Sequence, residues 1–172
     1  MAPPGRYAVR LALTPAGAGA PTWEQRQPLV VRADPRAVQD GMTPARFAAQ
    51  WTHEVQARDL TTAMDALVAR VRTADSTLTA DSTAGRPVDA TRRAALRTLQ
   101  RALVAESVRY GRPGLQTQVQ YLYDLTGQAD QPVGRDAIER LAELQREVAA
   151  RTREADALLG PARPRAADAG AR

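Results

Sequence analysis

The sequence contains no cysteine, no lysine, no asparagine and only one histidine, His53. Without cysteine the chain can form neither a disulfide framework nor a thiolate metal site, and a single histidine excludes His-rich zinc sites. The same shortage disfavours a Ser-His-Asp or Cys-His catalytic site. No glycine-rich phosphate loop or cluster of metal ligands occurs either. We therefore predict that the chain holds no metal and no cofactor.

Aromatic residues and long apolar runs are also scarce. Aromatics make up 4% of the 172 residues, and about 35 of the hydrophobic residues are alanine. The larger remainder is mostly Leu and Val, so we expect one domain whose core is built from these residues at helical spacing. No apolar run approaches the length that spans a bilayer, and the first residues lack the pattern of an export signal. The sequence thus predicts no membrane partner.

Positive charge is present but dilute. All 24 basic residues are arginine, set against 19 acidic ones, for a net charge of +5. An all-arginine composition is typical of a GC-rich coding sequence rather than of a selected arginine surface. The last thirteen residues carry a net +2 of this charge, which leaves +3 for the rest of the chain. Because a nucleic-acid footprint needs clustered charge, we predict no nucleic-acid partner.

The N-terminal residues 1–36 show the alternating pattern of a β-hairpin. Tyr7, Val9 and Leu11 alternate with Ala and Arg up to a Gly/Pro-rich loop, and a second run covers about 23–32. No third strand follows. A two-stranded hairpin is marginal alone. Its cover has to come from the following helices, from a second copy of the chain, or from a β-module absent from this sequence.

From Thr43 the pattern becomes helical. Thr43 is placed as an N-cap and Pro44 as the first helical residue, and neither Gly nor Pro interrupts the chain until Gly85. We predict a mainly α fold: an N-terminal β-hairpin, as the remnant of an Ig-like sandwich, followed by an antiparallel bundle of about four helices. The expected ranges are a linker at 37–43, a bundle at 44–159 with helices at 44–82, 89–111, 115–126 and 135–159, and a disordered tail at 160–172.

The first predicted helix has apolar residues on two opposite sides. A stripe from Leu60 to Leu78 suits the second and fourth helices, whereas a second set lies about 180° away. We expect this second set to cover the hairpin, with Trp51 as the joint. An exposed Trp51 beside an uncovered hairpin would instead mark a docking surface. The candidate interaction face therefore combines the helix residues Phe47, Trp51 and Val55 with the hairpin residues Tyr7, Val9 and Leu11.

Two groups of residues have the chemistry of a reactive site. His53 lies on the same side as Leu60, which favours a half-buried packing residue over a general base. Glu139, Glu143 and Glu147 repeat at spacings of four, as paired carboxylates for sugar hydrolysis would. Interleaved arginines favour a solvated face with weak ion pairs instead.

The third predicted helix carries two tyrosines. Tyr121 and Tyr123 flank an apolar arc of roughly 200°, so this helix should be wedged between neighbours. We predict that both rings are largely buried with their hydroxyls at the rim, and that neither stacks on a ligand.

Several segments resemble a bacterial family. The chain resembles the end of large bacterial BNR-repeat, sortilin-like β-propeller proteins, often labelled glycosyl hydrolases, whose propeller is missing here. Because any glycan site would lie in that propeller, no catalytic residue is transferred to this chain. The resemblance covers most of residues 4–159 and is carried by Pro4–Leu11 with Gln27–Arg36 and by Leu115–Tyr123 with Ala129–Ala137.

The resemblance implies a noncatalytic C-terminal accessory region that docks on a β-propeller module or on a partner subunit, including a second copy of the chain. It also implies a periplasmic or secreted parent protein. Two alternatives stay open. One is an autonomous helical adaptor that binds another protein through the Phe47, Trp51 and Val55 face. The other is a glycoside hydrolase that uses the row from Glu139 to Glu147.

Overall fold

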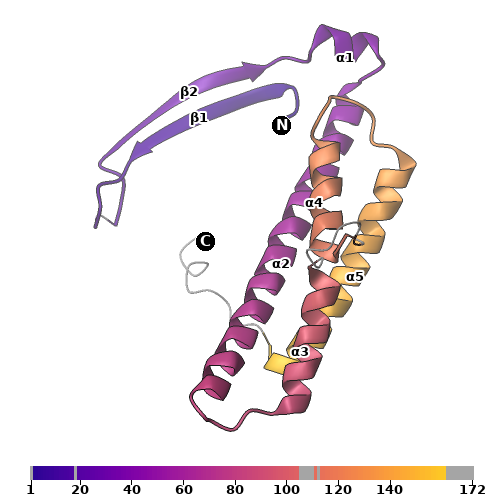
Figure 1. Cartoon of the computed structure of the whole chain (residues 1–172). Helices are drawn as coiled ribbons and strands as arrows, with labels where there is room; N and C mark the ends of the chain where they lie inside the picture. The colour runs from indigo at the N-terminus through magenta and orange to yellow at the C-terminus, as the bar shows by residue number, and fades with distance from the viewer. Residues whose placement is uncertain (1, 18, 105–110, 112, 162–172) are drawn as a thin grey trace.

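The computed structural model describes residues 2–17, 19–104, 111 and 113–161. It is mainly helical, with an N-terminal antiparallel hairpin followed by the helices of a bundle (Figure 1), which confirms the predicted fold class. The elements in chain order are β1 (Gly5–Leu13), β2 (Trp23–Val31), α1 (Pro35–Gln39), α2 (Pro44–Thr83), α3 (Ala90–Leu103), α4 (Leu115–Thr126) and α5 (Arg135–Leu159).

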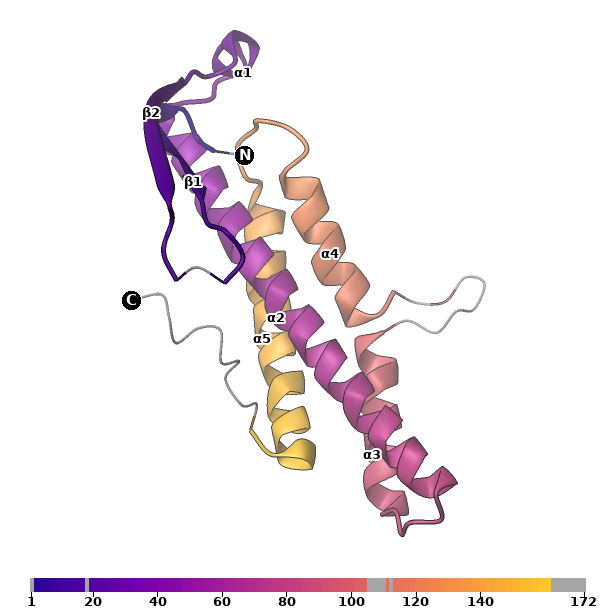
Figure 2. The ribbon, with the colours of Figure 1, turned by 90° about the vertical axis from the view of Figure 1, so that its left-hand side faces the viewer.

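The bundle is organised around the long helix α2. Helices α3 and α4 both run antiparallel to α2 and lie one after the other along it, while α5 packs against all three (Figures 1 and 2). Side-chain bonds mark this order. Arg97 lies 3.9 Å from Asp75 near the end of α2, and Gln116 donates to Asp65 in its middle at 2.8 Å. Two shorter helices thus lie in succession along one side of the long helix.

Helix caps place most boundaries where the sequence predicts them. The Thr43 side chain accepts a hydrogen bond from the Arg46 amide, and Pro44 occupies the first turn of α2. Asp89 accepts bonds from two amides at the start of α3. Helix α3 ends at Leu103, and the prediction of an end at residue 111 is wrong, because the backbone adopts an extended conformation at Val104. Tyr110, expected on the α3 stripe, and residues 162–172 of the expected tail lie outside the described residues.

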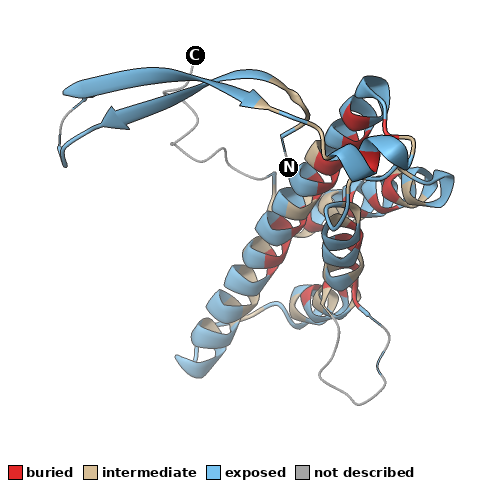
Figure 3. Cartoon of the chain, turned by 90° about the horizontal axis from the view of Figure 1, so that it is seen from above, coloured by how far each residue is buried: buried red, intermediate tan, exposed pale blue. Residues whose placement is uncertain are grey.

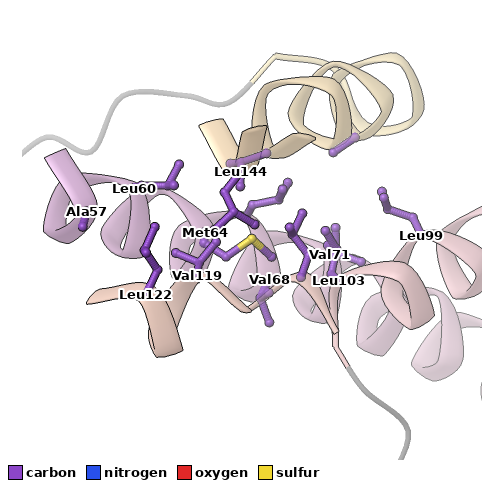
Figure 4. Close-up of a cluster of buried hydrophobic side chains, with 14 of the residues drawn as sticks. Ala57, Leu60, Met64, Val68, Val71, Leu99, Leu103, Val119, Leu122 and Leu144 are labelled. Carbon is purple, nitrogen blue, oxygen red and sulfur yellow. The ribbon is translucent and has the colours of Figure 1, made fainter. Parts of the chain in front are cut away.

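The core consists of aliphatic side chains contributed by α2, α3, α4 and α5 (Figure 4). No aromatic residue belongs to its fully buried part among the described residues, as the composition predicts. Ile138, expected on the buried stripe of α5, lies in the first turn of the helix and is 53% exposed. The largest fully buried side chains are Met64, Val71, Leu96, Leu99, Leu103, Leu115, Val119 and Leu144.

A short helix lies between the hairpin and α2, where a linker was predicted. Asp34 caps α1 by accepting from the Arg36 amide at 2.8 Å, and Pro35 fills the first turn. Gly41 then adopts a positive φ of 90°, a conformation that glycine takes without strain, and turns the chain into α2. Helix α1 thereby redirects the chain between the two parts of the molecule.

Candidate interaction surface

The strand register divides the hairpin into two chemically different faces. Direct partners in an antiparallel pair lie on the same face, and Leu13 pairs with Trp23 while Tyr7 pairs with Leu29. Since side chains alternate along each strand, one face collects the large apolar residues. This apolar face consists of Tyr7, Val9, Leu11, Leu13, Trp23, Leu29 and Val31, together with Gln25 and Gln27.

The opposite face of the hairpin is charged. Glu24 accepts hydrogen bonds from Arg10 at 2.7 Å and from Arg26 at 2.9 Å, and these bonds hold the pKa of the Glu24 carboxyl below its usual value. Arg6 lies on the same side. Three arginines against one glutamate leave a net positive charge, so this charged face suits solvent or an acidic neighbour.

Within the part of the chain that the structure describes, no element covers the apolar face. Six of its large side chains are 37–63% exposed, and only the two residues at the root of the hairpin, Gly5 and Val31, are half-buried (Figure 3). The six together leave on the order of 600 Å² in water, which matches the largest apolar patch of a typical monomer. The expectation that the start of α2 covers Tyr7, Val9 and Leu11 is therefore wrong.

The three helix residues of the predicted face have different surroundings. Phe47 is buried against Ala37 and Met42, because α1 folds over the start of α2 and takes the place expected for the hairpin. Val55 is half-buried. Trp51 is 39% exposed and lines a cavity of 40 Å³ beside the root of the hairpin. Trp51 thus stands next to an uncovered hairpin, the arrangement expected from the sequence at a docking surface.

Buried polar groups fix the same end of the bundle. The Gln50 side-chain amide donates to the carbonyl oxygens of Thr126 at 3.3 Å and Ala129 at 2.7 Å. It thereby ties α2 to the segment that leaves α4. His53 is 5% exposed, and its Nε2 atom has no hydrogen-bond partner. Burial lowers its pKa, partly opposed by the charge of Glu54.

These positions refine the sequence predictions for this end. His53 is a packing residue as predicted, although it is buried more completely than expected. Gln50 was missed, because a glutamine on an exposed face and one that bonds to a distant loop have the same local pattern.

A groove of 810 Å³ runs between α4 and α5. Tyr121 lines it and is 65% exposed, so the prediction that this ring is buried is wrong; Tyr123 is half-buried against the core. No element covers the outer side of α4 among the described residues. Glu139 and Glu143 lie at the rim of the groove, in ion pairs with Arg135 and Arg140.

No family model, curated protein or solved structure matches this chain. The resemblance to BNR-repeat proteins therefore remains a prediction. In the described part of the chain, no three side chains are grouped in a way that could hold a metal ion, and no helix combines the length and apolarity needed to cross a bilayer.

Proposed function

We propose that this chain is a noncatalytic accessory region that binds a β-sheet module, namely a BNR-repeat β-propeller, through the hairpin. The observation that carries the proposal is the uncovered apolar face, defined above, on a hairpin that projects away from the bundle (Figure 1). The resemblance of both strands to the segments that close the β region of such proteins supports the choice of partner.

Burial energetics favour an occupant for this face. Transfer of apolar surface out of water is favourable by about 25 cal/mol per Å², and a standard interface buries about 800 Å² on each side. The apolar face with Trp51 beside it approaches that size. A sheet packs on a sheet at about 10 Å, with alternating side chains interdigitating, and the alternation in β1 provides such a surface.

The adaptor alternative is less well supported. It requires Phe47, Trp51 and Val55 to be available together on one side of α2. Phe47 is 6% exposed because it packs in the small cluster with Ala37 and Met42. The hairpin, rather than the helix face, offers the larger exposed apolar surface.

Calorimetric titration against a BNR-repeat propeller domain from the same genome tests the proposal. Leu11 and Val30 form a matched pair, since both lie in the hairpin and are 63% and 58% exposed, but on opposite faces. We expect Leu11→Glu to raise Kd at least tenfold, because it places a charge in the contact, and Val30→Glu to change it less than threefold.

Two results would contradict the proposal. One is the absence of any heat of binding with the unmodified chain. The other is an equal effect of the Leu11 and Val30 substitutions, which would indicate that the apolar face makes no contact. The position of the gene gives an independent check, since a propeller coding sequence directly upstream is expected.

A further inference from the structure

The two outer edges of the hairpin differ in their backbone groups. In a strand, successive residues point their N–H and C=O groups alternately at the partner strand and away from it. The carbonyl oxygen of Leu13 accepts a hydrogen bond from the Thr22 amide at 2.9 Å. The backbone N–H and C=O groups of Leu13 therefore face the β2 side of the hairpin. Alternation then directs the N–H and C=O groups of four residues toward the free edge of β1: Arg6, Ala8, Arg10 and Ala12.

The edge of β2 is interrupted by a proline. Pro28 is the direct partner of Ala8, so its backbone nitrogen also faces outward, away from β1. This agrees with the phase set by Leu13, because a proline nitrogen has no hydrogen to give to the neighbouring strand. The outer edge of β2 therefore lacks a donor at its centre, whereas the outer edge of β1 is complete.

We infer that the partner adds a β-strand to the hairpin at the free edge of β1 and not at β2. This inference rests on the proposed function and specifies how the hairpin is used. With this addition the sheet has three strands, and a sheet of three strands with an apolar face can be stable on its own. Main-chain bonds then supply the affinity, and alternate side chains supply the specificity.

The two faces of the hairpin define the chemistry of the incoming strand. On the apolar face it contacts Tyr7, Val9 and Leu11, so it carries Val, Ile or an aromatic residue at every second position. On the charged face it lies beside Arg6 and Arg10, where the hairpin has an excess of positive charge. Charge complementarity selects acidic residues at the positions in between.

Amide exchange on the full chain tests this inference without any substitution. The probe is a capped synthetic peptide of alternating valine and glutamate with a threonine at each end. In excess over the isotope-labelled chain, it is expected to slow exchange at least tenfold at the amides of Arg6, Ala8, Arg10 and Ala12. The outward amides of β2, at Glu24, Arg26 and Val30, keep their rates.

A pair of proline variants provides the second measurement. Ala8→Pro gives β1 the same missing donor that Pro28 gives β2, and it is expected to weaken peptide binding at least tenfold. Pro28→Ala, directly across the pair, is the control and leaves the affinity for β1 within twofold. Protection of the inward amides of Tyr7, Val9 and Leu11 verifies that each variant hairpin is formed.

Three outcomes overturn the inference. Peptide-induced protection at β2, or at neither edge, shows that β1 is not the acceptor. Concentration-dependent protection of β1 without peptide shows that a second copy of the chain occupies this edge. Unchanged binding by a correctly folded Ala8→Pro variant contradicts the role of the β1 amides.

The exchange and calorimetric results separate this inference from the proposed function. If Leu11→Glu weakens propeller binding while the β1 amides stay unprotected, the proposed function stands and the edge inference fails. If the peptide protects β1 but the propeller does not bind, the proposed partner is wrong.

Discussion

Both the bundle and the hairpin place apolar residues at regular spacing, but only the bundle buries them. Met64, Leu99 and Leu144 are fully buried, whereas Val9, Leu11 and Leu13 are all more than half exposed. Each helix of the bundle has at least two neighbours, so the central part of its apolar stripe is buried. The hairpin is a single layer. Burial therefore depends on the number of layers the chain provides and not only on the hydrophobicity of a segment.

The largest expected difference between the two regions is in their response to the same substitution. In the bundle, Leu144→Ala removes a side chain that is fully buried and leaves a cavity, which should lower the free energy of unfolding by about 3 kcal/mol. Urea denaturation followed by the helical circular dichroism signal measures this loss. Gln145→Ala, at the exposed neighbouring position, is the control and should cost less than about 0.5 kcal/mol.

A smaller effect is expected where the bundle holds the end of α4. Gln50→Ala leaves the carbonyl groups of Thr126 and Ala129 without their donor and should cost about 2 kcal/mol in unfolding free energy. Gln56→Ala on the exposed side of α2 is the matched control. If both variants unfold at the same urea concentration, the Gln50 bonds do not contribute to stability.

The bundle should also lose stability on mild acidification. Burial lowers the pKa of His53 in the folded chain. Near pH 6.5 the imidazole of His53 therefore binds a proton in the unfolded chain but stays neutral in the folded chain. The free energy of unfolding therefore has its full value above about pH 6.5. It decreases as the pH falls from there to the pKa of His53 in the folded chain. Urea titrations between about pH 7.5 and 5.5 measure this slope. His53→Leu should flatten it, and an unchanged slope would assign the effect to other groups.

The smallest effect is expected in the hairpin. Leu11→Ala should change the unfolding free energy of the bundle by less than about 0.5 kcal/mol, because the side chain packs against no helix. The same urea experiment compares it directly with Leu144→Ala. A cost close to that of Leu144→Ala would mean that the hairpin lies against the bundle in solution, and the contrast between the two regions would disappear.

Local signals predict most of the helices. The cap at Thr43 with Pro44 and the cap at Asp89 both mark real boundaries, since capping is decided within one turn. Helix α1 was missed although it has the same signature, an Asp34 cap followed by Pro35. In the sequence this pair also reads as the end of a strand, and five residues are too few for a periodic pattern.

Predictions that depended on tertiary neighbours were less successful. The wide apolar arc of α4 suggested neighbours on both sides, but α2 and α5 enclose only one, and Tyr121 faces the open groove. Similarly, Trp51 and the hairpin were expected to cover each other. The turn at Gly41 and the short helix α1 set the direction in which the hairpin leaves the bundle, and no residue pattern encodes that direction.

Pro28 has a consequence for how far assembly can proceed. A sheet with two open edges can recruit strand after strand and grow into a fibre, which is the usual hazard of an exposed hairpin. With Pro28 in the outer edge of β2, only β1 offers a complete row of outward donors, so the addition of a strand at β2 is disfavoured. The exposed apolar face can thus be kept for binding with less tendency for the sheet to extend through both of its edges.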